Sequence, residues 1–130
     1  MHEDRLSPEL GRLIDAAKAA AARVAPAFAR AEGVAVLTGT GAVHAGYVGD
    51  DDSAAPARCA AESALSSARR AGDGKVLTAA VAVANDPAES VFPSPDCRRS
   101  LAEVDPDLPL VVKQLGRWVM LPLSQLSPPA

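Results

Sequence analysis

The residues that could carry chemistry in this chain are few and lie far apart in the sequence. Two cysteines, Cys59 and Cys97, and two histidines, His2 and His44, are present among many carboxylates. Thiolates and imidazoles are the ligands that zinc prefers in proteins, but cysteine is also one of the most commonly buried residue types. The cysteines are therefore either metal ligands or ordinary buried residues, and their sparse spacing favours the second alternative.

The elements that would position these residues alternate along the chain. Ser7 and Pro8 begin an expected first helix, because Ser is a common N-cap and Pro is tolerated at the first helical position. Apolar and β-branched runs predict strands, and Gly72 marks the end of an Ala-rich second helix. The expected order is a helix, a hairpin of strands 34–38 and 43–48, a helix over 59–71, a strand beginning near 75, a helix over 97–104, and strands over 108–115 and 117–123. This order predicts an α/β fold with a mixed sheet covered by helices.

The composition limits what the protein can bind. The 130 residues fit one compact domain, and a formal charge of −3 lacks the basic excess typical of nucleic-acid-binding proteins. No apolar run reaches the length of a membrane helix, and the N-terminus does not resemble a signal peptide. We therefore expect a cytoplasmic protein with small-molecule or protein partners and with neither nucleic-acid nor membrane binding.

Several short sequence words occur in an informative order. They are "EGVAVLTGTG", "GYVGD", "AESAL", "PSPDCRR", "DPDLPLVV" and "LPLSQLSP". In this order and spacing they resemble the small cytidine deaminases, from the first helix almost to the C-terminus. The resemblance implies a three-layer α-β-α fold, with a mixed five-stranded sheet and helices on both faces. It also implies a single domain over residues 1–130, in which we expect 1–6 and 127–130 to be flexible.

The resemblance implies a metal site that has lost most of its ligands. The family holds zinc by three thiolate or imidazole ligands and uses a glutamate as proton shuttle, a role that falls to Glu62 here. Cys97 matches the last ligand, whereas Ser94 and Ala60 stand at the other two positions. Cys59 comes one residue too early, and on a helix it would point about 100° away from the ligand direction. We expect no cofactor; in the alternative, the helix start shifts and Cys59 joins Cys97 around zinc.

The resemblance also indicates where a nucleoside would bind. Phe28 is the aromatic residue closest to the family's stacking position, and Tyr47 stands at one of the two sugar-binding positions. Asp50 begins an acidic run that could supply a carboxylate, although such a run is more often a solvated turn. Arg98, which matches an arginine beside the family's metal thiolates, is expected to pair with Glu62 or to cap a carbonyl group.

These residues favour a non-catalytic homologue of the family that binds a nucleoside-like ligand or a protein. The alternative is an active hydrolytic deaminase of cytidine or a modified nucleoside, with Glu62 as its proton shuttle. A third hypothesis is a structural subunit that pairs with an active relative. The resemblance and the Ala-rich helices indicate self-association to a dimer or tetramer.

Overall fold

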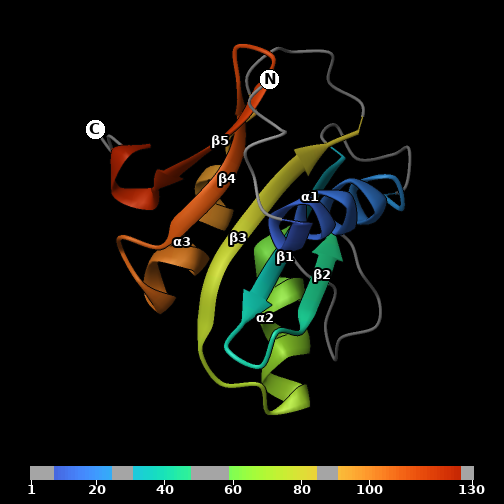
Figure 1. The fold of residues 1–130 in the computed structure, drawn as a ribbon, viewed down its shortest axis with the longest axis vertical. Coiled ribbons are helices and arrows are strands. Elements are labelled where there is room, and N and C mark those ends of the chain that lie inside the picture. The colour runs from blue at the N-terminus through green and yellow to red at the C-terminus, as the bar shows by residue number, and fades with distance from the viewer. Residues whose placement is uncertain (1–7, 25–30, 48–58, 85–90, 127–130) are drawn as a thin grey trace.

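The computed structural model of the chain describes residues 8–24, 31–47, 59–84 and 91–126. The elements follow the predicted order (Figure 1). They are helix α1 (Pro8–Ala21), strands β1 (Glu32–Thr38) and β2 (Val43–Tyr47), helix α2 (Ala60–Ala71), strand β3 (Val76–Val83), helix α3 (Pro95–Val104), strands β4 (Pro109–Gln114) and β5 (Arg117–Pro122), and a short 3-10 turn, η2 (Leu123–Gln125). None of the helices in these ranges has the length and hydrophobicity needed to cross a membrane. The segments expected to be flexible, 1–6 and 127–130, lie outside the described residues.

The five strands form one mixed sheet in the order β2-β1-β3-β4-β5. β3 and β4 run parallel, and the other neighbouring pairs are antiparallel. The parallel pair requires a crossover connection, and α3 lies within that connection. The predicted mixed five-stranded sheet is therefore confirmed.

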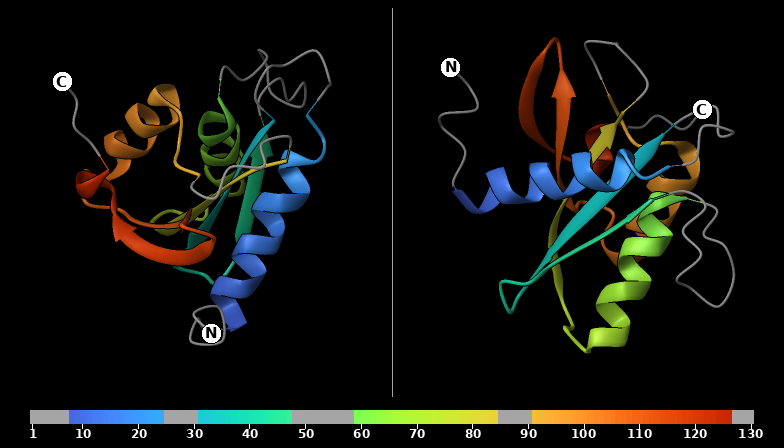
Figure 2. Two further views of the ribbon diagram at one scale, coloured as in Figure 1. Left: turned by 90° about the horizontal axis from the view of Figure 1, so that it is seen from above. Right: turned by 90° about the vertical axis from the view of Figure 1, so that its right-hand side faces the viewer.

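Successive side chains of the central strands point to opposite faces of the sheet and so divide the core into two layers. Val34 and Val36 of β1 face one layer, whereas Ala35 and Leu37 face the other. The first layer packs against α2 and α3 and the second against α1, and Figure 2 shows the helices on opposite faces of the sheet. This arrangement is the predicted three-layer α-β-α fold.

Two glycines allow the helices to approach the sheet closely. A Cβ atom added at Gly33 of β1 would overlap backbone atoms of Ala17 and Ala21 in α1. A Cβ atom added at Gly46 of β2 would overlap the backbone of Ala64 and the side chain of Ser63 in α2. The alanines that α1 and α2 direct at the sheet are thus buried in the chain's own core.

Candidate functional site

The site begins where the N-termini of α2 and α3 meet. Cys59 is the N-cap of α2, and its sulfur accepts a hydrogen bond from the backbone N–H of Glu62 at 3.4 Å. Cys97, in the first turn of α3, accepts one at 3.4 Å from the N–H of Ala61 in α2. Both sulfurs therefore lie at the same helix N-terminus, and their residues are only 3% and 0% exposed.

This placement of Cys59 differs from the sequence-based expectation. The prediction that Cys59 points about 100° away assumed that it lies within the helix. Its backbone is instead extended, with φ −145° and ψ 160°, because an N-cap residue lies just outside the helix. The side chain turns back over the first turn of α2, beside the Cys97 thiol.

The two thiols affect each other's ionisation in opposite directions. Hydrogen bonding between the two side chains lowers the pKa of Cys59 from 9.0 to about 7, against the opposing effect of burial. The N–H of Glu62 and the hydroxyl of Ser100, 3.8 Å from the Cys59 sulfur, act in the same direction. The same pairing raises the pKa of Cys97 well above its ordinary value, together with burial and the charge of Glu32. Of the two, Cys59 is therefore the more acidic group and the first to become a thiolate.

Glu32 is a site residue that the sequence analysis missed. It begins β1, is only 3% exposed, and its carboxylate lies against the start of α3. The Cys97 thiol donates to Oε1 at 3.1 Å, and the Ser94 hydroxyl donates to the same oxygen at 3.0 Å. The backbone N–H of Ser94 donates to Oε2 at 2.9 Å. A buried carboxylate requires such donors, because without them its removal from water would be very costly.

Ser94 has two roles in this arrangement. It is the N-cap of α3, and its hydroxyl accepts the backbone N–H of Cys97 at 3.4 Å while donating to Glu32. Pro95 at the first helical position favours the same helix start. The serine that stands at a ligand position of the resembled family is therefore engaged in hydrogen bonds with the protein itself.

These residues do not fit a zinc site with three protein ligands. Cys59 and Cys97 have suitable chemistry, but the third position is a neutral hydroxyl that already bonds to Glu32. Within the described ranges, no group of three or more His, Cys, Asp and Glu side chains is arranged to hold a metal ion. The residues of this chain that the structure describes thus supply two thiols and an adjacent carboxylate, whose nearest oxygen is hydrogen-bonded to one of the thiols.

The other predicted site residues are distributed around this centre. Glu62 lies in the first turn of α2, and its side chain is exposed. Tyr47 ends β2 and is half-buried, with the guanidinium of Arg23 lying 5.2 Å from the centre of its ring. Phe28 and Asp50 lie outside the described residues.

Of the two expected contacts of Arg98, a pair with Glu62 or a bond to a carbonyl group, the structure shows the second. Its Nη1 donates to the backbone carbonyl of Leu126 at 3.3 Å, so the alternative expectation of a capped carbonyl is the one that the structure shows. Among the residues that the structure describes, no ion pair joins Arg98 to Glu62. This hydrogen bond of Arg98 therefore connects α3 to the turn that follows β5.

His44 is held in a hydrogen-bonded cluster away from the cysteines. Its Nδ1 lies 3.1 Å from the hydroxyl of Ser67 in α2, and its Nε2 contacts the carboxylate of Asp73. The imidazole thus connects β2 to α2 and to the segment that follows it. Both ring nitrogens of His44 are thus engaged by side chains of the protein.

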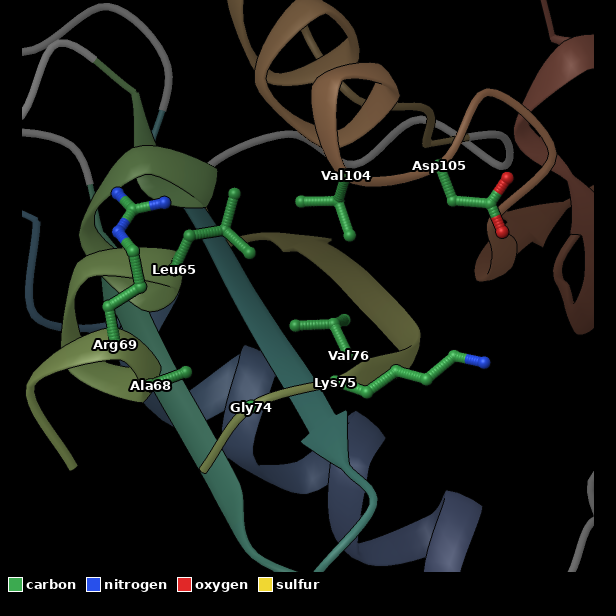
Figure 3. Close-up of a pocket in the computed structure, with 8 residues that line it drawn as sticks. All are labelled: Leu65, Ala68, Arg69, Gly74, Lys75, Val76, Val104 and Asp105. Carbon is green, nitrogen blue, oxygen red and sulfur yellow. The ribbon is translucent and has the colours of Figure 1, made fainter. Parts of the chain in front are cut away.

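A separate pocket of about 390 Å³ opens on the same side of the sheet. In Figure 3 the apolar side chains of Leu65, Val76 and Val104 surround its centre, whereas Lys75 and Asp105 lie on one side. The described residues that line it are Leu65, Ala68, Arg69, Gly74, Lys75, Val76, Val104 and Asp105. None of the predicted site residues that the structure describes is among them.

The structure is similar to solved structures of cytidine deaminases. The enzyme from Burkholderia pseudomallei matches 96% of this chain and 99% of its own, with a TM-score of 0.72 and 29% sequence identity. The Mycobacterium leprae enzyme matches 95% of this chain and 100% of its own at TM-score 0.68 and 25% identity. The Mycobacterium tuberculosis enzyme matches 95% and 98% at TM-score 0.69 and 23% identity.

No family model matches the sequence, and no curated protein matches it. The likeness therefore lies in the fold and in the order of the sequence words along it. The chain has a cytidine deaminase-like fold, as the sequence resemblance predicted.

Proposed function

We propose that this cytidine deaminase-like chain does not catalyse zinc-dependent deamination and that it binds a nucleoside-like small molecule. The hydrogen bonding of Glu32 carries the first half of the proposal. Its carboxylate receives donors from Ser94 and Cys97, the two positions that match zinc ligands in the resembled family. A thiol that donates a hydrogen bond retains its proton, whereas a zinc ligand must be a thiolate.

The second half rests on the retained scaffold. The fold aligns over almost the full length of enzymes whose names identify cytidine as their substrate. Tyr47 ends a strand beside α2, where its phenol group could donate to a sugar hydroxyl. A nucleoside-like ligand is therefore the small molecule that the scaffold supports best.

Metal content, turnover and binding test this proposal together. The full chain, purified without chelator, is expected to contain much less than one zinc per chain and to release no ammonia from cytidine. Isothermal titration with cytidine and uridine should give measurable binding of both, because discrimination by a metal-bound water is absent. One firmly bound zinc per chain together with cytidine turnover would overturn the proposal.

A matched variant tests whether Ser94 is the reason for the missing metal. Ser94→Cys places a third thiol beside Cys97 and Cys59, and we expect this variant to retain more zinc than the wild type. Ser94→Ala removes the same hydroxyl without adding a ligand and serves as the control. Equal zinc content in Ser94→Cys and Ser94→Ala would show that a missing thiolate at this position is not what prevents metal binding.

One observation favours the alternative of an active hydrolytic deaminase. Cys59 lies beside Cys97 and does not point away, so two thiol ligands are available near the exposed carboxylate of Glu62. A third ligand from another subunit would complete a metal site in that case. Cytidine turnover that requires added zinc and falls on Glu62→Gln would support this alternative over the first.

We also propose that the chain self-associates to a dimer or tetramer in the cytoplasm. Among the residues that the structure describes, four large apolar side chains are more than 40% exposed, namely Leu77, Val104, Leu115 and Met120. Burial of such side chains in a subunit contact is favourable. The two free cysteines are consistent with a reducing compartment. Light scattering after size exclusion tests the association, and a monomer across the micromolar range would contradict it.

A further inference from the structure

We propose that Cys59 and Cys97 are a redox site that closes reversibly into an intramolecular disulfide, with hydrogen peroxide or a small hydroperoxide as the oxidant. The inference starts from their placement. Both sulfurs accept N–H groups of the same α2 N-terminus, Glu62 for one and Ala61 for the other. Both cysteines are free in this structure.

The surroundings of the two sulfurs differ in a way that assigns their roles. The Cys59 sulfur is approached by the N–H of Glu62 and by the Ser100 hydroxyl at 3.8 Å. This sulfur belongs to the N-cap residue, which is 3% exposed. Cys97 is 0% exposed and donates its proton to Glu32 Oε1 at 3.1 Å. Cys59 is thus the attacking sulfur and Cys97 the resolving one.

The chemistry balances without any group from outside other than the oxidant. The Cys59 sulfur attacks one oxygen of a hydroperoxide, the O–O bond breaks, and an alcohol or water leaves as Cys59 becomes a sulfenic acid. The Cys97 sulfur then attacks the Cys59 sulfur, the S–S bond forms as the S–O bond of the sulfenic acid breaks, and the departing hydroxide takes a proton from solvent and leaves as water. Glu32 accepts the Cys97 proton as that bond forms and returns it to solvent. Two thiols are oxidised by two electrons, and one peroxide is reduced.

Burial restricts which oxidants can react. Cys59 is 3% exposed, so the oxidant must be small, and Cys59 at the start of α2 is the sulfur that it reaches first. The resulting disulfide would join the first turn of α3 to the start of α2. It would also remove the hydrogen bond that Cys97 donates to Glu32.

Thiol counting and intact mass test the proposal on the full chain. Reduced protein is treated with hydrogen peroxide in slight excess, quenched, and analysed under non-reducing conditions. We expect the count of reactive thiols to fall from two per chain to none and the mass to fall by that of two hydrogen atoms. Digestion should yield a peptide that links Cys59 to Cys97. Dithiothreitol should reverse each of these changes. Cys59→Ser and Cys97→Ser each remove one partner and should give no such peptide.

Two further measurements keep the test decisive. Arsenite, a small reagent that bridges neighbouring thiols, should bind the untreated protein with one arsenic per chain and protect both cysteines from alkylation. Glu32→Gln should slow disulfide closure about tenfold or more while leaving sulfenic acid formation at Cys59 unchanged. Three outcomes would overturn the proposal. They are disulfides that form only between chains, oxidation of Cys59 past sulfenic acid while Cys97 stays reduced, and zinc held by both thiols. A count that stays at two thiols per chain after peroxide treatment, and falls only when denaturant is added, would also overturn the proposal.

Discussion

Replacement of the buried carboxylate Glu32 by alanine is expected to lower the free energy of unfolding by about 3 kcal/mol. The side chain is 3% exposed, and from the described residues it accepts two hydrogen bonds of Ser94 and one of Cys97. Hydrogen bonds to a charged group each contribute about 1.5–3 kcal/mol, which gives a gross loss of about 5–9 kcal/mol. The variant no longer buries a charge, and relief of that desolvation cost returns several kcal/mol.

Thermal and urea unfolding of the full chain measure this change. For a domain of 130 residues, a loss of about 3 kcal/mol corresponds to a midpoint lower by about 10–15 °C. Glu103→Ala is the matched control, because Glu103 is exposed on α3, and it should stay within about 0.5 kcal/mol of the wild type. The cycle of Glu32→Ala, Ser94→Ala and the double variant should give a coupling energy of about 1–3 kcal/mol.

The cycle separates the proposed network from simple loss of volume. If Glu32→Ala is as stable as Glu103→Ala, or if the Glu32 and Ser94 changes are additive, the carboxylate does not join β1 to the start of α3. If Glu32→Ala instead unfolds the chain completely, Glu32→Gln provides the comparison. Its amide keeps the volume and one acceptor, so it should lose less stability than the alanine variant.

Two further predictions concern the cysteine pair and the close contact between α1 and the sheet. Absorbance of the thiolate in the ultraviolet should titrate with a pKa of about 7 in wild-type protein, and Cys97→Ala should move the pKa of Cys59 upward because the strongest cause of its lowering is removed. A titration that starts only near the ordinary pKa of 9.0 would contradict the assignment of Cys59 as the thiolate. Gly33→Ala should cost several kcal/mol and shift the thermal midpoint strongly, because its Cβ has no room beside α1. Gly11→Ala, where the added Cβ meets nothing within 4 Å, should be neutral or up to about 1 kcal/mol stabilising, and equal stability of the two variants would exclude the overlap.

The fold could be predicted because its signals are local and mutually consistent. The apolar run of β3 and the Gly72 that ends α2 each specify an element without reference to distant residues. Once the order of helices and strands is known, few ways remain to cover a mixed sheet on both faces. The structure confirms both the order and the layers.

The position of Cys59 was misjudged because a rule for helix interiors was applied at a helix end. Successive side chains turn by about 100° only within the helix, whereas an N-cap residue has extended backbone angles. The sequence does contain the relevant signal, since Cys59 precedes Glu62 by three residues at the start of an Ala-rich helix. Cysteine is an uncommon N-cap, however, and the pattern usually sought there has Ser, Thr, Asp or Asn.

Glu32 was missed for a different reason, because burial of a carboxylate depends on partners that are distant in the sequence. A glutamate followed by glycine before an apolar strand usually indicates an exposed turn. Its donors come from Ser94 and Cys97, and only the parallel crossover that carries α3 past β1 brings them together. The same contact alters the meaning of "PSPDCRR". Ser94 and Cys97, which match ligand positions in the resembled family, both donate hydrogen bonds to the carboxylate of Glu32. A thiol beside a carboxylate can release its proton to it when a second thiol is oxidised.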